Sequence, residues 1–532
     1  MLDLNKAEFP EPSQNQGIVM PNKKFTNKSG KPNTSSTCNT HKDFEDNQPA
    51  SNQHQLNAKP DISSGALIIV MQTSEGERKK LMIESKAAQI IKKSLQGYYA
   101  FDSGSQTWHQ YMGSHWEPLQ SPQLFDKELI RLLYSGSGEV GFRLPYKNGI
   151  KSLLADGIML PLPVPVKAGL PFINGLLNLK SGELQHITPE NALSWCLPYE
   201  YKKNADCPNI KSWLKTAVNG DEEITQFLRA WMAAVLHGRN DLQKFLHLKG
   251  SGGTGKGTFM RLLTALVGYI NTAITNLYQL EQNRFETAAL FNKRLAIISD
   301  SDKYGGSINT LKAITGQDPI RLERKHQQQA GSFIFPGLVV IASNESLQFT
   351  DHTSGPDRRR VTVIFDRRVT DEERQVWEKQ GGEEAVLHSE LPGLVNWLLE
   401  LSADKISQII LNPPPQIRNA NLEAMTASNP IAGWLIECCI PDLNAWTQMG
   451  DRREIKESGR ETGYKNSDTW LYANYLLWCQ RNSKISLSNG KFKEILIQTC
   501  VTLGHSVLEA RHGKGKGIKG LRIKSIHEQY QW

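Results

Sequence analysis

The chain has 532 residues, 39% of them hydrophobic, and its 62 Lys and Arg against 54 Asp and Glu give a formal net charge of +8. At roughly 150 residues per domain, this length predicts a globular protein of two to four domains. There is no apolar run of about 18 residues and no charged-then-apolar leader, so we expect a cytoplasmic protein with no membrane span. The modest positive charge suits a polyanionic partner without requiring one.

Cysteine usage points to free thiols. The seven cysteines are an odd number, form no CxxC pair and lie mostly in apolar contexts such as WLIECCI. This pattern favours buried thiols in a reducing compartment over a zinc ribbon.

The first 60 residues are rich in Asn, Ser, Gln, Lys and Pro and show almost no apolar periodicity. Such a segment cannot bury enough surface to offset the entropy lost on ordering, so residues 1–60 are predicted to be disordered. Order is predicted to begin with a strand over 66–72, followed by a helix over 77–95. Both belong to a predicted α+β domain over 61–205, in which the NG and SG dipeptides at 174–175 and 181–182 indicate tight turns between short strands.

Residues 206–410 are predicted to form the principal domain. An amphipathic helix opens it, with Asp221 as N-cap and Gly238 at its end. From about 242 to 365, apolar strand-like runs alternate with helical stretches, which indicates an α/β fold with a largely parallel sheet. A helical linker with an exposed polar loop is predicted over 411–466, and a small final domain over 467–532.

A glycine-rich loop, GSGGTGKGT, lies between a predicted strand at 244–248 and a predicted helix at 258–267. Glycines there let backbone N–H groups converge on phosphate oxygens, the helix N-terminus adds partial positive charge, and a lysine reaches the β/γ-phosphates. The usual pattern has Ser or Thr directly after the lysine, but this chain has a glycine first. The predicted nucleotide-binding residues are Gly250, Ser251, Gly252, Gly253, Thr254, Gly255, Lys256, Gly257 and Thr258.

Two later strands end in polar residues that suit the same site. KRLAIISDSD ends in Asp300 and Asp302, and GLVVIASNE ends near Asn344. At the mouth of a parallel sheet, Asp300 would organise a phosphate-bound Mg²⁺ and Asp302 would polarise the attacking water. Asn344 would sense the γ-phosphate. The hydroxyl position on Mg²⁺ would be filled by Thr258 or by a water.

Two basic groups complete the pattern. After a predicted helix ending at Gly316, a hairpin is expected to carry Arg324, Lys325 and His326 at its tip, where cations can grip a single-stranded backbone. The run SGPDRRR precedes another strand, so Arg359 or Arg360 suits an arginine finger reaching across a subunit boundary. Alternatively, the hairpin is simply a solvated charged turn and the arginines are an ion-paired strand edge.

Taken in order, these five elements resemble the superfamily 3 helicases, most closely the poxvirus-type and phage/plasmid primase–helicase branch. The matching stretches are the glycine-rich loop, the acidic strand end, LKAITGQDPI, LVVIASNE and the following arginines. The similarity extends over about residues 95–525. It includes a segment before the helicase domain, the helix ELPGLVNWLLEL, and a C-terminal region similar to the family's winged-helix domain.

The resemblance implies an α/β, P-loop, AAA+-like ATPase core with an α+β N-terminal domain and a C-terminal winged-helix domain. It implies ATP and Mg²⁺ as cofactors, with Thr258 and Asp300 near the metal. It also implies a homo-oligomer, expected as a hexameric ring, that moves 3′ to 5′ on single-stranded or forked DNA. The wing RHGKGKGIKG would contact phosphates through Arg511, Lys514, Lys516 and Lys519.

Two other functions remain open at this stage. The chain could be a non-unwinding initiator or regulatory ATPase, or a small-molecule phosphotransferase that uses the GKGT loop. The first 200 residues contain neither the acidic-pair-plus-His pattern of a primase nor a cysteine-rich zinc module. Primer synthesis is therefore expected from a separate primase or polymerase partner.

Overall fold

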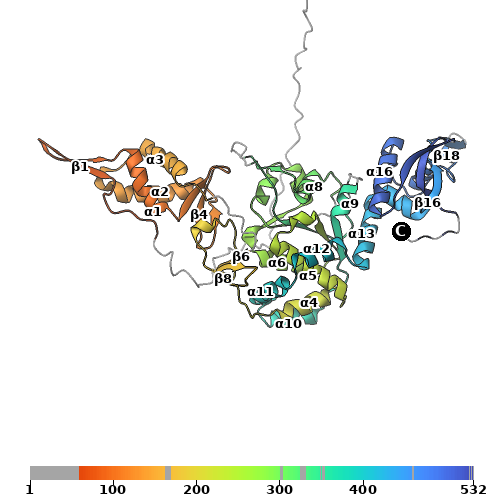
Figure 1. The fold of residues 1–532 in the computed structure, drawn as a ribbon, viewed down its shortest axis with the longest axis horizontal. Coiled ribbons are helices and arrows are strands. Elements are labelled where there is room, and N and C mark those ends of the chain that lie inside the picture. The colour runs from red at the N-terminus through yellow and green to blue at the C-terminus, as the bar shows by residue number, and fades with distance from the viewer. Residues whose placement is uncertain are drawn as a thin grey trace, which may run out of the picture. The chain divides into compact units, whose positions relative to one another are not determined.

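The computed structural model describes residues 59–161, 169–299, 304–323, 331–347, 349, 354–457, 460–513, 515–525, 528 and 530. The segment predicted to be disordered, 1–60, lies almost entirely outside these ranges. Figure 1 shows the elements, which we describe as separate parts of the chain. Among the described residues, none of the helices is both long and apolar enough to cross a bilayer.

The first described part contains a hairpin, a three-stranded antiparallel sheet and three helices around one apolar core. The elements are β1 (Ile68–Thr73), β2 (Gly76–Leu81), α1 (Glu84–Leu95), β3 (Tyr99–Asp102), β4 (Thr107–Tyr111), β5 (Trp116–Pro118), α2 (Pro122–Ser137) and α3 (Leu144–Gly157). The predicted helix over 77–95 is wrong in its first part. Residues 77–81 pair with β1 instead, because Gly76, at φ 119°, lets the chain turn back.

The next three strands are separated by turns at the two positions that the sequence predicted. The strands β6 (Gly169–Phe172), β7 (Gly175–Asn178) and β8 (Leu184–Gln185) form one antiparallel sheet. The dipeptide at 174–175 ends the first turn, and the one at 181–182 lies inside the second.

The central part is built on a five-stranded sheet in the order β10-β11-β14-β9-β15, and every pair in it is parallel. This confirms the predicted α/β fold. Its elements are α4 (Pro208–Ala217), α5 (Glu222–His237), β9 (Phe245–Lys249), α6 (Lys256–Val267), β10 (Thr272–Thr275), α7 (Leu277–Gln282), β11 (Leu295–Ile298), α8 (Asn309–Gly316), β12 (Ile320–Arg321), β13 (Ser332–Phe333), β14 (Leu338–Ser343), α9 (Ser354–Arg359), β15 (Arg360–Ile364), α10 (Asp371–Glu378), α11 (Glu383–Leu399), α12 (Ala403–Leu411) and α13 (Pro415–Ser428).

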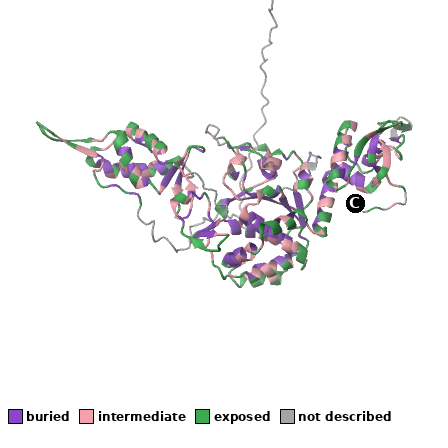
Figure 2. Ribbon diagram, in the orientation of Figure 1, coloured by how far each residue is buried: buried purple, intermediate pink, exposed green. Residues whose placement is uncertain are grey.

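Alternate residues of each strand face opposite layers of helices. In β9, Leu246 and Leu248 join a core that includes residues of α5, α6 and α11, whereas Phe245 joins a second core with residues of α7 and α8. The three inner strands of the sheet, β11, β14 and β9, are buried almost throughout (Figure 2). Near-continuous apolar strands are what a parallel sheet covered on both faces requires.

Helix α5 shows how local sequence sets an element. The Asp221 carboxylate accepts a hydrogen bond from the Ile224 backbone N–H at 3.0 Å, and Gly238, at φ 67°, ends the helix. Both ends were predicted, and the cap satisfies a backbone donor that has no partner within the helix.

The last part contains α14 (Pro430–Cys438), β16 (Cys439–Gln448), β17 (Glu454–Glu457), β18 (Arg460–Tyr464), α15 (Leu471–Arg481), α16 (Asn489–Thr502), β19 (Leu508–His512) and β20 (Gly515–Ile523). Helices α15 and α16 pack against each other, and the Tyr475 and Phe492 rings stack with centroids 4.6 Å apart. Trp434 of α14 packs in the same core, and β16 pairs with β20. The domain boundary predicted at residue 467 therefore lies inside this packed unit. The polar loop predicted before that boundary contains the β17–β18 hairpin.

A buried histidine joins three strands of the central sheet. His247 of β9 is fully buried; its Nε2 lies 2.7 Å from the Ser343 hydroxyl of β14, and its Nδ1 lies 3.4 Å from the Thr362 hydroxyl of β15. Burial, with added repulsion from Arg360 and Lys249, lowers the pKa of His247 to about 3. The imidazole is therefore neutral in the folded sheet at physiological pH.

This shift predicts a pH-dependent stability. Below the ordinary histidine pKa the unfolded chain binds a proton that the folded chain excludes, so stability falls as pH drops from about 6.5 toward 3. The expected loss is about 2 kcal/mol at pH 5 relative to pH 8. Thermal unfolding of the wild type and of His247→Gln at both pH values measures it. The variant should lose this part of the pH dependence, and equal dependence in both proteins would contradict the prediction.

Candidate functional site

The glycine-rich loop connects the carboxyl end of β9 to the first turn of α6. Gly255, at φ 92°, precedes the helix, which begins at Lys256. A Cβ on Gly250 would lie 1.9 Å from the Phe365 carbonyl oxygen, so only glycine fits where the chain leaves the sheet. The loop therefore presents backbone groups, rather than side chains, at a helix N-terminus, an arrangement that can hold phosphate oxygens.

Lys256 and Asn344 meet beside this loop, as the sequence predicted. The Lys256 ammonium donates to the carbonyl oxygens of Gly250 and Ser251, the latter at 2.8 Å, and to the Asn344 Oδ1 at 3.3 Å. Asn344 follows directly on β14, the neighbour of β9 in the sheet. A lysine ammonium and a strand-end amide, 88 residues apart in sequence, are thus in contact beside the glycine-rich loop.

Both residues line a cavity of about 770 Å³, a volume within the range of small-molecule and cofactor sites. Its floor is the glycine-rich loop and the strand ends at Ser299 and Asn344. Its other walls are formed by α4, α10 and the start of α11, which the sequence reasoning did not connect with the site. The wall residues include Asn209, Trp213, Thr216, Arg367, Arg374, Trp377 and Glu383.

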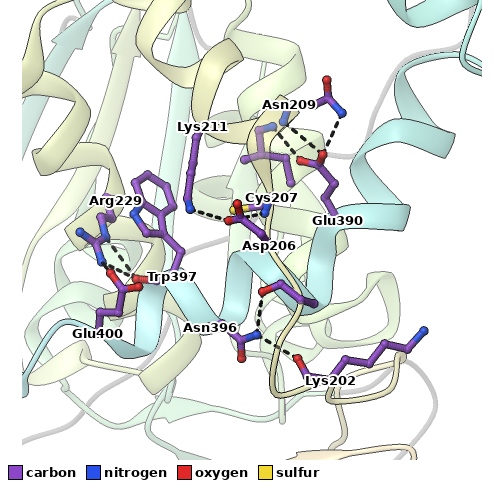
Figure 3. A network of polar contacts seen from close by, with 12 residues as sticks. Lys202, Asp206, Cys207, Asn209, Lys211, Arg229, Glu390, Asn396, Trp397 and Glu400 are labelled. Atoms are coloured by element: carbon purple, nitrogen blue, oxygen red, sulfur yellow. Dashed lines mark hydrogen bonds and ion pairs between the residues drawn. The ribbon is translucent and has the colours of Figure 1, made fainter.

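Helix α4 is held in place by α11, as Figure 3 shows. The Glu390 carboxylate, in a residue only 8% exposed, accepts hydrogen bonds from the Asn209 backbone N–H at 3.1 Å, the Asn209 side-chain amide at 2.8 Å and the Ile210 backbone N–H at 2.9 Å. These donors are at the N-terminus of α4, where a negative charge is favourable. A Cβ on Gly393 would lie 2.2 Å from the Asp206 backbone, so the two segments approach closely.

Further contacts in the same network fix the chain before α4. The Asn396 amide donates to the carbonyl oxygens of Lys202, Lys203 and Ala205 at 2.9, 3.1 and 2.9 Å. Arg229 of α5 pairs with Glu400 at 2.6 Å. The network therefore sets the position of the cavity wall that α4 contributes.

Thr258, one position later than the usual hydroxyl, is turned toward α11. Its hydroxyl donates to Glu383 Oε2 at 3.0 Å, and Arg261 pairs with the same carboxylate at 2.6 Å. On a helix, adjacent positions point about 100° apart, so a hydroxyl at 258 does not replace one at 257. Thr258 could face a metal at the loop only after exchanging its bond to Glu383.

The two predicted carboxylates, Asp300 and Asp302, lie outside the described residues. The strand before them is described, and Ser299 at its end lines the cavity. Within the described ranges, no group of three His, Cys, Asp or Glu side chains is close enough together to hold a metal ion. The tip residues Arg324, Lys325 and His326 are also outside these ranges, whereas the flanking strands β12 and β13 pair as predicted.

The three consecutive arginines differ in their environments. Arg360 is 2% exposed and pairs with Asp357 at 2.7 Å, so the structure corrects its assignment as a finger: it is an ion-paired strand residue inside its own chain. Arg359 is half-buried and donates to the Gly355 carbonyl oxygen at 3.2 Å. Arg358, which the sequence reasoning passed over, is the exposed member. Burial and the neighbouring Arg358 both lower the pKa of Arg359.

The predicted DNA-contacting residues of the last part lie on one hairpin. Arg511 of β19 is directly opposite Lys516 of β20, and both are exposed, as is Lys519. Lys514, which lies between these strands in sequence, is outside the described residues. Arg511 and Lys516 thus place two cations side by side beside this turn.

Fold and site together define a protein with a parallel α/β core in which a glycine-rich loop, a lysine and a strand-end asparagine share one cavity. Two family models match parts of it. Residues 248–360, from β9 to the arginines, match a family of unknown function, DUF5906. Residues 165–219, which include α4, match the model described as "D5 N terminal like".

Individual relatives match shorter stretches. The uncharacterized mitochondrial protein ymf21 of Marchantia polymorpha is 28% identical over 128 residues, which are 22% of this chain and 71% of that protein. The mimivirus protein L207/L206 from Acanthamoeba polyphaga mimivirus, provisionally named a helicase, is 28% identical over 160 residues, 28% of this chain but 17% of that protein. Among solved structures, the C-terminal region of NrS-1 aligns over 79% of this chain and 94% of its own at 14% identity and a TM-score of 0.41, which is too weak to support an argument.

The Glu390 contacts predict a measurable contribution to stability. Glu390→Ala removes the acceptor of three hydrogen bonds at the start of α4 and is expected to cost roughly 1–3 kcal/mol. Glu390→Gln keeps an acceptor and should cost less. Thermal unfolding measures both.

The matched control is Glu384→Ala, on the same helix, whose side chain is 90% exposed. It should leave the unfolding temperature nearly unchanged. If the Glu390 and Glu384 variants behaved alike, the capping role of Glu390 would be wrong.

Proposed function

We propose that this protein is an ATP-dependent DNA helicase of replication type that works as a ring. The observation that carries the proposal is the contact of Lys256 with Asn344 at the mouth of a parallel sheet, beside a loop that only glycine can form. A cation and an amide that share one phosphate site can bind a nucleotide and respond to loss of its γ-phosphate. The match to a mimivirus protein with a helicase name supports the choice of function.

The residues of this chain would divide the work. The loop from Gly250 to Gly255 would hold phosphate oxygens through backbone N–H groups, and Lys256 would neutralise the β/γ-phosphates after leaving its loop carbonyls. Asp300, immediately after Ser299 at the cavity, would orient the metal, and Asp302 the attacking water. Mg²⁺ would supply charge neutralisation between the phosphates.

The geometry favours an arginine contributed by another subunit. Strands β9 and β15 run parallel, and Arg360 pairs in register with Phe245, the first residue of β9, whereas the loop follows Lys249, the last. Arg358 therefore lies at the edge of the sheet opposite its own loop. An exposed arginine there can complete a site only on a neighbouring copy, as a ring arrangement provides.

The remaining parts would handle DNA. Arg511, Lys516 and Lys519 would offer phosphate contacts without a base-specific pattern. The chain between the paired strands β12 and β13 contains Arg324, Lys325 and His326, which would add further cations. We further propose 3′ to 5′ translocation on single-stranded DNA and a separate primase or polymerase partner. The rival of a non-unwinding initiator shares every one of these contacts, so only an unwinding assay separates the two.

A phosphotransferase remains the second candidate, because one observation favours it. Such an enzyme needs arginines on a lid over its phosphates, and Arg367 and Arg374 line the cavity from the segment that includes α10. It should hydrolyse or transfer phosphate without stimulation by single-stranded DNA.

The central test is Lys256→Ala in two assays, ATP hydrolysis with and without single-stranded DNA, and displacement of a labelled strand from a fork. The wild type should show DNA-stimulated hydrolysis and displacement, and the variant should lose about a hundredfold or more of the hydrolysis. Lys405→Ala, an exposed lysine of α12, is the matched control and should behave as the wild type.

Each result identifies a function. DNA-stimulated hydrolysis without displacement would favour the initiator, and hydrolysis indifferent to DNA would favour the phosphotransferase. Retained hydrolysis in Lys256→Ala would exclude the assigned loop as the nucleotide site.

Subunit mixing tests the arginine. Arg358→Ala and Lys256→Ala should each be inactive alone, but a mixture should regain hydrolysis, because roughly one interface in four then combines an intact Lys256 with an intact Arg358. Arg368→Ala, an arginine beyond β15, is the control and should remain active alone. A mixture as inactive as its components would contradict a finger supplied by the neighbour.

A further inference from the structure

Two tryptophans form one wall of the cavity and have no part in phosphate binding. Trp213 of α4 and Trp377 of α10 have ring centroids 6.3 Å apart at an interplanar angle of 47°. Both line the cavity and both are only half-buried, so part of each indole faces the open space. Residues 164 positions apart in sequence have been brought together here as one continuous aromatic surface.

This surface adjoins the glycine-rich loop. The Cζ2 atom of Trp213 lies 3.6 Å from the position that a Cβ on Gly255 would occupy. The segment leading to α10 is tied to the loop by the Val369 N–H, which donates to the Gly253 carbonyl oxygen at 3.1 Å. A molecule with its phosphates on the loop would therefore have its next group beside the indoles.

Helix α10 also places a positively charged side chain beside the loop. Arg374, one turn before Trp377, has a side chain 56% exposed and comes within 3.7 Å of the Cβ position of Gly253. The helix thus offers a cation on the side of the phosphates and an indole farther along. This order of charge and aromatic ring matches a nucleoside triphosphate lying along the cavity.

We propose that Trp213 and Trp377 are the base-binding wall of the site, on which the purine of a nucleoside triphosphate stacks. The proposal rests on the proposed nucleotide function of the loop. Stacking on an aromatic face recognises ring area and tolerates differences at the base edge. A purine covers more of the wall than a pyrimidine does.

Two polar side chains of this wall already donate hydrogen bonds within the protein. The Thr216 hydroxyl donates to the Ser212 carbonyl oxygen at 2.8 Å, and the Asn209 side-chain amide donates to Glu390. To distinguish adenine from guanine, a site must form hydrogen bonds to the edge of the base, and these two donors already bond to other protein groups. The site should therefore bind ATP and GTP with similar affinity, and both more tightly than CTP.

The test compares the direct binding of ATP, GTP, CTP and inorganic triphosphate by titration calorimetry. In the wild type, ATP and GTP should bind more tightly than inorganic triphosphate. Trp377→Ala should weaken ATP and GTP by about tenfold while leaving triphosphate binding unchanged. Trp377→Phe, which keeps an aromatic face, should restore most of the loss.

Trp213 and Trp377 both pack partly against the core. An alanine variant of either residue is therefore informative only if its triphosphate binding is unchanged, which shows that the loop is intact. Tyr269→Ala, a 75% exposed aromatic residue away from the cavity, is the matched control and should bind all four ligands as the wild type does. Equal binding of ATP by Trp377→Ala and the wild type would overturn the base wall. So would a wild type that binds ATP no better than triphosphate.

The two proposals fail separately. Lys256→Ala should abolish triphosphate binding, and if it does not, the loop is not the phosphate site and both proposals fall. Tryptophan-dependent purine binding without DNA-stimulated hydrolysis would leave the base wall standing and reject the helicase.

Discussion

The parallel alignment of β14, β9 and β15 is the constraint on which the site depends. Because the three strands run in the same direction, the chain segments that follow them emerge at one edge of the sheet. The glycine-rich loop, Asn344 and the segment leading to α10 therefore meet there. Close packing sets the details: the carbonyl oxygen of Phe365 occupies the space beside Gly250, and the Lys256 ammonium bridges the loop and Asn344.

The same alignment separates residues that are near in sequence. Arg358 and Arg359 precede β15 and lie at the opposite edge of the sheet, while Phe365 and Val369 follow it and touch the loop. A strand of five residues spans about 17 Å, too far for an arginine side chain to reach back to its own site. An arginine that precedes β15 could therefore reach the glycine-rich loop of another subunit, but not that of its own chain.

The rest of the cavity depends on contacts between segments far apart in the chain. Glu390 and Asn396 of α11 hold α4 and the chain before it through backbone donors and acceptors, and Gly393 allows the close approach. Burying a carboxylate is costly, and the hydrogen bonds at a helix N-terminus offset that cost. The tryptophan wall exists because α4 is fixed in this way and α10 is tied to the loop.

Much of the fold could be predicted from local signals. Asp221 and Gly238 cap α5 by their own chemistry, and the apolar runs of β9 and β14 indicate buried parallel strands. The glycine-rich loop can be recognised from sequence because its signal is a local order of residues. Prediction failed over 77–81, where alternation is weak and pairing with β1 decides the strand, and after 449, where a polar stretch forms a hairpin.

The sequence alone determined most of the elements, their order, and the residues whose chemistry is local: the loop, Lys256 and Asn344. Only the tertiary structure decided which arginine is exposed, since Arg358, Arg359 and Arg360 are chemically identical and differ in what packs around them. It also decided that Trp213, Trp377 and Glu383 share a cavity with the loop. Those contacts join segments that are not neighbours in sequence, and no local pattern encodes them, because they arise from the packing of helices that each bury an apolar face.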